Sequence, residues 1–435
     1  MANQEPAVCH AVIALGAAHQ DIIFRGLHLF PSSERKRGVW YLYSLEESAR
    51  AFELLRRRNT QDPQMRQVML LCCLLFVFLN LVQRDYDTAF RHLRAGLQVL
   101  TELNSSGLPL FGTSAHIPVD PCLLAAFAQL ETQSTHFSVI NLQLWDHQLE
   151  FSQPRDNESD LLHQSVDERR RMIEPLINAM FKFFKRCWTE SESEIASHYG
   201  ELQSIQTRLI SEVHRATLSF AKFYAVRYAS LTRKQQRGAD LIRLCLLTQS
   251  VGLRTSLIHN NPELLLPFTP DYAALLSQSK KIIAQFPDRP TVMVDTGVIL
   301  PLYIVADACQ DLTLRWEAIQ VLRDWPHYEG PYDSVLVSII LAERCRVQMR
   351  ARVHNELRAL LDNEQLSHAA FESMVEAELR AQMRIVISQR GDGDDTRPVG
   401  SQTQTEADVE AEFSQAMSLE CQKWTCIRRI KKLKE

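Results

Sequence analysis

The stretch from Leu202 to Phe223, LQSIQTRLISEVHRATLSFAKF, decides the fold class of this chain. Its apolar residues recur every three or four positions, as Leu202, Ile205, Leu209, Val213, Ala216, Phe220 and Phe223. Residues at this spacing share one face of an α-helix, and polar residues such as Glu212 and Lys222 fall outside that face. The stretch therefore predicts a helix of about six turns with one buried face.

The same spacing recurs along most of the chain. It appears in Leu42, Leu45, Ala49 and Phe52, in Phe90, Leu93, Leu97 and Leu100, and in Val335, Ser338, Ala342, Cys345 and Met349. No stretch alternates apolar and polar residues between Gly or Asn-Gly turns, as the strands of a hairpin do. We therefore predict an all-α protein of roughly 12 to 16 helices.

The composition agrees with a folded helical chain. Hydrophobic residues make up 46% of the 435 residues, a fraction that excludes disorder over the whole chain. Only 14 residues are Gly, less than half the usual share of about 7%, and hairpin turns depend on Gly. A formal net charge of −4 argues against a protein whose bulk wraps nucleic acid.

A change in composition near the C-terminus marks the predicted domain boundaries. Residues 391–406, GDGDDTRPVGSQTQTE, have almost no apolar content and predict a flexible linker. Residues 1–390 are expected to form one all-α body, and residues 407–435 an amphipathic helix that ends in the basic run RRIKKLK. Basic residues are favourable at a helix C-terminus, so the run can simply end the helix. The alternative interpretation is that it serves as a nuclear-import or phosphate-contacting segment.

The ten cysteines predict neither a zinc site nor a disulfide framework. They show no paired C-x2-C spacing, and most lie in apolar stretches, so we expect reduced, buried thiols. No signal peptide is visible at the N-terminus. The apolar run VMLLCCLLFVFL, Val68 to Leu79, is shorter than a membrane span and is bracketed by Arg66 and Arg84, so we expect a core helix and no membrane.

The search for catalytic chemistry is negative. The sequence contains no H-E-x-x-H, G-x-S-x-G, G-x-x-x-x-G-K or G-x-G-x-x-G motif. Asp307 and Asp311 are four residues apart, and on one helix they would share a face that could hold Mg²⁺. No third acid completes such a site, so we favour a polar helix face on which Arg315 pairs with Asp311. We predict no catalytic, cofactor-binding or metal-binding residues; an enzyme built around the aspartate pair is the less favoured alternative.

Three stretches together carry a resemblance to a known family. They are PAVCHAVIALGAAHQ at residues 6–20, the apolar segment and AFRHLRAGLQVL within residues 70–100, and PLYIVADACQDLTLRWEAIQVLRDWPHYEGPYDS at residues 301–334. Over roughly residues 5 to 385 the chain resembles the regulatory region of fungal binuclear zinc-cluster (Zn2Cys6) transcription factors. That family shows P-L-Y-x-V-A followed by L-L-x-x-x-P-x-x-E-G-x-W-D-S, and Tyr332 stands here where Trp is frequent.

The third stretch also has a direct structural interpretation. Trp325-Pro326 is expected to end one helix, because proline disfavours helical geometry in the residue before it. Residues 329–331 predict a turn, and Asp333 or Ser334 can cap a helix that runs to about Arg352. We interpret this stretch, named the corner (residues 325–334) below, as architecture rather than as a ligand site.

The resemblance implies a transcription regulator in the nucleus. Family members read DNA through an N-terminal module of six cysteines that holds two zinc ions, and none of the ten cysteines here forms one. We therefore expect no direct sequence-specific DNA binding, no cofactor, and action through other transcription factors or co-regulators, as a homo- or heterodimer. Many members control gene clusters of specialised metabolism or catabolism, so the resemblance implies such a setting, with any small-molecule effector unknown.

Two alternatives remain open at this point. One is a cytoplasmic helical adaptor or scaffold. The near-neutral charge supports it, as does a predicted hairpin over Asp87 to Leu103 that is similar to half a tetratricopeptide unit. No 34-residue repeat follows that hairpin. The other is a truncated gene model of a full zinc-cluster factor, whose cysteine-rich exon would lie upstream of Met1.

Overall fold

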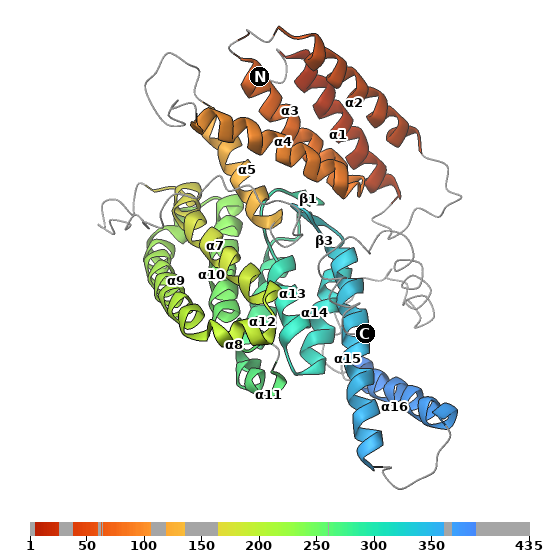
Figure 1. Cartoon of the computed structure of the whole chain (residues 1–435). Helices are drawn as coiled ribbons and strands as arrows, with labels where there is room; N and C mark the ends of the chain where they lie inside the picture. The colour runs from red at the N-terminus through yellow and green to blue at the C-terminus, as the bar shows by residue number, and fades with distance from the viewer. Residues whose placement is uncertain are drawn as a thin grey trace. The chain divides into compact units, whose positions relative to one another are not determined.

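The computed structural model in Figure 1 describes residues 5–25, 38–59, 62, 64–105, 119–134, 164–259, 261–360 and 368–388. Most of these residues are helical, and the only strands among them are three of two residues each. The predicted all-α class is confirmed, and the number of helices within the described ranges lies between 12 and 16. The predicted linker and basic helix, residues 391–435, lie outside the described residues.

The chain forms two compact units that are interleaved along the sequence. Unit 1 comprises residues 1–242, 289–296 and 327–332, and unit 2 comprises residues 243–288, 297–326 and 333–435. The polypeptide therefore leaves unit 1 and returns to it twice. The predicted domain boundaries at residues 390 and 406 stay predictions.

Unit 1 begins with five helices: α1 (Pro6–Arg25), α2 (Val39–Arg57), α3 (Met65–Val82), α4 (Tyr86–Ser105) and α5 (Pro121–Ser134). Helix α1 packs on α2 and α3, and α3 packs on α4. Their core holds Ala7, Val8, Ala11, Ala14, Ala18, Ala51, Val68, Cys72, Phe76, Leu79 and Val82. Because alanines line α1, its backbone can approach its neighbours closely. Helix α4 is one continuous helix, so the predicted hairpin over Asp87 to Leu103 is wrong.

Helix α3 contains the apolar run that could be mistaken for a membrane span. By length and composition alone, Pro6–Phe24 of α1 and Met65–Val82 of α3 could each cross a membrane. Half of the α3 window is buried inside the structure, and it supplies nine buried residues to unit 1. This burial is what a core helix requires.

The second part of unit 1 contains α7 (Val166–Thr189), α8 (Glu192–Ser197), α9 (Tyr199–Arg227), the short 3-10 helix η2 (Tyr228–Ser230) and the start of α10 (Arg233–Thr255). The α9 stripe is confirmed, because Leu202, Leu209, Val213, Phe220 and Phe223 are all buried. Residues 190–194, ESESE, are rich in acids, and the last three of them belong to α8. Ser191 and Glu194 make a reciprocal capping box that starts α8.

Unit 2 contains α11 (Pro262–Leu265), the 3-10 helix η3 (Leu266–Phe268), α12 (Thr269–Gln285), α13 (Ile299–Ala308), α14 (Leu312–Asp324), α15 (Ser334–Leu360) and α16 (His368–Ser388). The buried Arg315 of α14 ties three of these helices together. Its Nε donates to the carbonyl of Ala306 in α13 at 2.7 Å, and its Nη2 donates to Gln348 Oε1 in α15 at 2.6 Å. Hydrogen bonds inside unit 2 thus take the place of those that the Arg315 guanidinium would make to water.

The thiols in the described residues are all unpaired with one another. Cys72, Cys187, Cys309 and Cys345 are buried and Cys73 and Cys245 are half-buried, as expected, whereas Cys9 and Cys122 are exposed. Burial disfavours the thiolate, and it raises the pKa of Cys72 to about 12 and the pKa of Cys73 to about 11.

These environments predict selective alkylation. At about pH 8, iodoacetamide should modify Cys9 and Cys122 of the native protein and leave Cys72 and Cys73 intact, because only the thiolate reacts. A change to about pH 9 still lies far below a pKa of about 12, so the order should not change. Peptide mass spectrometry measures the labelling, and denatured protein is the control in which every thiol reacts. Equal labelling of Cys72 and Cys9 in native protein would contradict this burial.

Candidate functional site

The corner joins two helices of unit 2 through a short excursion into unit 1. Helix α14 ends at Asp324, directly before Trp325-Pro326, as predicted. Helix α15 begins at Ser334 and is capped by Asp333, whose Oδ1 accepts from the backbone N–H groups of Val335 and Leu336 at 3.0 and 3.2 Å. The helix continues past the predicted end at Arg352 to Leu360.

Within unit 1, the corner is fixed by backbone pairing. Strand β2 (Tyr328–Glu329) pairs in parallel with β1 (Val292–Met293), and β3 (Tyr332–Asp333) lies on the other side of β2. The Tyr328 N–H donates to the Thr291 carbonyl at 2.8 Å, and the Gly330 N–H donates to the Met293 carbonyl at 2.7 Å. Gly330 has a φ of +55°, the left-handed region that the predicted turn at 329–331 requires.

The side chains of the corner are buried and hydrogen-bonded. His327 Nε2 lies 2.9 Å from Glu329 Oε1, and both side chains are at most 1% exposed. The Tyr332 hydroxyl donates to the backbone carbonyl of Gln133 in α5 at 3.1 Å, and Gln133 Nε2 donates to the Val294 carbonyl at 3.1 Å. These polar groups face the interior of unit 1. The motif therefore serves to connect separate segments of the chain.

The aspartate pair does not share a helix face. Asp307 lies in α13, which ends at Ala308, and Asp311 is the N-cap of α14. The side chain of Asp307 forms an ion pair with Arg344. Asp311 Oδ1 accepts from the backbone N–H groups of Thr313 and Leu314 at 2.8 and 3.1 Å. The prediction of one helix through both aspartates, with Arg315 paired to Asp311, is therefore wrong, because the chain breaks its helix at residues 309–311.

No group of three or more His, Cys, Asp or Glu side chains that could hold a metal ion occurs within the described ranges. The expectation that the chain has no catalytic, cofactor-binding or metal-binding residues stays a prediction. Asp307 is already neutralised by Arg344, and Asp311 serves its helix, so neither supports the magnesium alternative.

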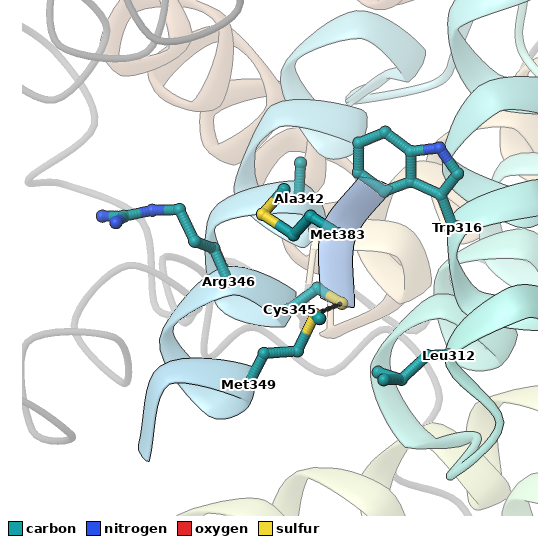
Figure 2. Close-up of a pocket in the computed structure, with 7 residues that line it drawn as sticks. All are labelled: Leu312, Trp316, Ala342, Cys345, Arg346, Met349 and Met383. Atoms are coloured by element: carbon teal, nitrogen blue, oxygen red, sulfur yellow. Dashed lines mark hydrogen bonds between the residues drawn. The ribbon is translucent and has the colours of Figure 1, made fainter. Parts of the chain in front are cut away.

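A small apolar cavity among the described residues of unit 2 merits comparison with a ligand site (Figure 2). It is lined by Leu312, Trp316, Ala342, Cys345, Arg346, Met349 and Met383, from α14, α15 and α16. Cys345 Sγ lies 3.9 Å from Met349 Sδ, and the Arg346 side chain points away from the other lining side chains in Figure 2. Arg346 Nε and Nη2 donate to the two carboxylate oxygens of Glu343, at 2.7 and 2.9 Å.

The cavity is too small to be a preformed effector site. Its volume of about 10 Å³ accommodates at most a single water molecule, and its lining is almost entirely apolar. Pockets that hold drug-sized ligands measure roughly 300 to 1,000 Å³. An effector would therefore require the methionine side chains of α15 and α16 to move.

The family model for the fungal-specific transcription factor domain matches residues 1–328. The chain belongs to this family. The match includes all of α1 to α14, and it ends at Tyr328 inside the corner, so residues 329–334 of the resemblance lie beyond it. No curated protein and no solved structure matches the chain.

Membership of the fungal-specific transcription factor domain family supports a role in regulating transcription. The family is one of transcription factor domains and not of enzymes, which agrees with the absence of catalytic motifs in the sequence. The resemblance stated from the residues is thereby confirmed. The corner, of which residues 325–328 fall within the match, joins segments of the fold.

The geometry at Gly330 predicts that Gly330→Ala destabilises the protein by about 2 to 4 kcal/mol. A Cβ at this position would lie 1.9 Å from Gln133 Oε1, and φ is +55°, where an L side chain is strained. Urea unfolding monitored by circular dichroism measures the change. The matched control is Gly16→Ala in α1, which meets nothing within 4 Å and should gain about 0.5 to 1 kcal/mol. Equal effects at the two sites would contradict the tight turn.

The capping role of Asp311 gives a separate prediction. Asp311→Ala should cost about 1 kcal/mol of stability, and Asp311→Asn, which retains the acceptor oxygen, should cost only a few tenths. Thermal unfolding with and without Mg²⁺ checks the alternative directly. A magnesium site at this aspartate would raise the melting temperature of the wild type with metal concentration, and Asp311→Asn would abolish that rise.

Proposed function

We propose that this fungal-specific transcription factor domain regulates genes in the nucleus by binding other transcription factors or co-regulators, without reading DNA sequence itself. The observation that carries the proposal is the family match over residues 1–328 in a chain with no zinc-cluster spacing among its ten cysteines. By resemblance to the wider zinc-cluster family, its target genes belong to a specialised-metabolite or catabolic cluster.

The environments of the thiols support this mode of action. Zinc binds the thiolate, and burial raises the pKa of Cys72, Cys73, Cys309 and Cys345, which makes them poor ligands at neutral pH. The two exposed cysteines lie on different helices, Cys9 on α1 and Cys122 on α5. No three of the described thiols gather with one another, or with His, Asp or Glu, as a zinc site requires.

The surface charges also favour protein contact. Many exposed arginines sit beside a carboxylate one helical turn away, such as Arg50 with Glu46 at 2.5 Å and Arg352 with Glu356 at 2.7 Å. Phosphate binding depends on clustered positive charge that releases counterions, and a neighbouring carboxylate opposes it. A surface of locally neutralised charge suits a protein partner better than a DNA backbone.

The proposal predicts nuclear, chromatin-associated protein whose attachment depends on a partner. In a deletion strain complemented with the tagged chain, transcripts of a defined gene set should recover, and chromatin precipitation should recover their promoters. The purified chain alone should bind those promoter fragments and shuffled fragments equally weakly. Variant Asp311→Asn, which retains the helix cap, is the matched complementation control.

Two results would overturn this proposal in different ways. Protein that stays in the cytosol, with transcripts unchanged on deletion, would support the cytoplasmic adaptor instead. Promoter-specific binding by the purified chain would show direct DNA reading. Sequencing of the transcript upstream of Met1 for an in-frame exon with six cysteines would test the truncated gene model, because such a module would supply direct DNA contacts.

A further inference from the structure

Three sulfur-containing side chains from two helices line the small cavity of unit 2. Cys345 and Met349 come from α15, and Met383 comes from α16 (Figure 2). Cys345 and Met349 are four residues apart, so they project from the same face of α15, and each is at most 5% exposed. We name these three side chains the sulfur cluster. Its cavity is too small for an organic molecule but has the size of a single bound ion.

The two sulfur atoms on α15 have the separation of two ligands of one metal ion. Cys345 Sγ lies 3.9 Å from Met349 Sδ. An ion bound about 2.3 Å from each sulfur would make an S–metal–S angle of about 116°, close to the angle of a trigonal site. The pair can therefore share one ion without a change in the backbone of α15.

The third sulfur belongs to the inner side of α16. Met383 follows Val375 and Leu379 at steps of four residues, and those two side chains are 0% and 2% exposed. Met383 lines the same cavity as Ala342, which precedes Cys345 by one turn of α15. A methionine side chain has three rotatable bonds, so the Met383 sulfur can turn toward the pair on α15.

The rest of the cavity lining excludes hard cations. Leu312, Trp316 and Ala342 carry no acceptor oxygen or nitrogen on their side chains. Arg346 donates to Glu343 and points away in Figure 2. Mg²⁺ and Ca²⁺ require oxygen ligands, and structural Zn²⁺ takes four ligands from Cys, His, Asp and Glu. Thioethers are soft ligands, and one thiolate with two thioethers favours Cu(I).

The charge of a Cu(I) complex also suits this buried position. Cu(I) carries one positive charge and the Cys345 thiolate one negative charge, so the bound unit is neutral and avoids the cost of burying an unpaired charge. Zn²⁺ would leave a net positive charge near the buried Arg315, which donates to Gln348, the residue before Met349. Binding is a proton exchange: the Cys345 thiol releases its proton to solvent as the S–Cu bond forms, and no electron is transferred.

We propose that the sulfur cluster binds one Cu(I) ion, with the Cys345 thiolate and the thioethers of Met349 and Met383 as its three ligands. The site departs from the expectation that the chain has no metal-binding residues, which rested on Cys, His and acidic side chains. All three ligands lie beyond residue 328, outside the part of the chain that the family model matches. The site is independent of the proposed function, so its failure would leave that function standing.

A bound ion would add a connection between α15 and the C-terminal part of α16. In the structure, Arg350 of α15 pairs with Glu372 at 2.6 Å and with Glu376 at 3.1 Å. These ion pairs hold the first half of α16, and Met383 lies about two turns beyond Glu376. Coordination of Met383 should therefore slow hydrogen exchange in α16.

Competition with the chelator bicinchoninate for Cu(I), without oxygen and with ascorbate, tests the site in the full chain. The background protein carries Cys9→Ser, Cys122→Ser, Cys421→Ser and Cys426→Ser, which remove the two exposed thiols and the two that lie outside the described residues. It should hold one Cu(I) per chain and release one proton for each ion bound.

Variants in this background identify the ligands. Cys345→Ser should lower the affinity for Cu(I) by about 100-fold or more, because the thiolate is lost. Met349→Leu and Met383→Leu conserve volume, and each should lower the affinity by about 10-fold. The matched control is Cys309→Ser, which removes another buried thiol of unit 2 and should leave the affinity unchanged. Circular dichroism verifies folding, and the two leucine variants decide the question if Cys345→Ser does not fold.

Two further measurements report on the geometry. X-ray absorption at the copper edge should show three sulfur ligands at about 2.3 Å. Hydrogen exchange followed by mass spectrometry should show slower exchange in α16 when Cu(I) is added to the background protein, and no such change in Met383→Leu.

The proposal is overturned by any of four results. The first is background protein that gives up all its Cu(I) to bicinchoninate. The second is an equal loss of affinity in Cys345→Ser and Cys309→Ser, which would show that the ion binds buried thiols without selection. The third is nitrogen or oxygen ligands in the absorption spectrum. The fourth is unchanged affinity in Met383→Leu, which would remove α16 from the site.

Discussion

Two backbone hydrogen bonds hold together parts of unit 1 that the chain separates. Tyr328 and Gly330 donate to the carbonyls of Thr291 and Met293, and between these segments the chain builds α13 and α14 of unit 2. Parallel strands need a long crossover connection, and these two helices supply it. The left-handed Gly330 makes the turn between β2 and β3, and Asp333 then caps α15.

The all-α class was predictable because burial follows helical periodicity in α4 and α9. Phe90, Leu93, Leu97 and Leu100 are all buried, as their spacing indicates. The end of α14 and the cap of α15 were also predictable, since proline and aspartate act through their local backbone. The apolar run of α3 was correctly interpreted as core, because a helix apolar on most sides needs neighbours on most sides.

The periodic spacing of apolar residues identified a helix face in α2 but did not indicate whether that face is buried or exposed. Leu42, Leu45, Ala49 and Phe52 of α2 have helical spacing, but the buried residue on the opposite side of the helix is Glu47, whose half-buried partner His10 lies 37 residues away. No local pattern encodes that pairing. The prediction for Asp307 and Asp311 failed for a different reason: Asp311 caps a new helix, a position at which aspartate is strongly preferred. The Ser191–Glu194 capping box has the S-x-x-E pattern that indicates a helix start, although the segment is also strongly acidic.

The interleaving of the two units has a practical consequence for genetics. No single cut in the polypeptide separates unit 1 from unit 2, because residues 289–296 and 327–332 return to unit 1 from within the other. Serial truncation, a usual way to map the activities of a transcription regulator, cannot remove the whole of one unit without also removing part of the other. A truncated chain that loses activity would then report a broken fold rather than a missing region, and surface point substitutions are the better tool for dissection.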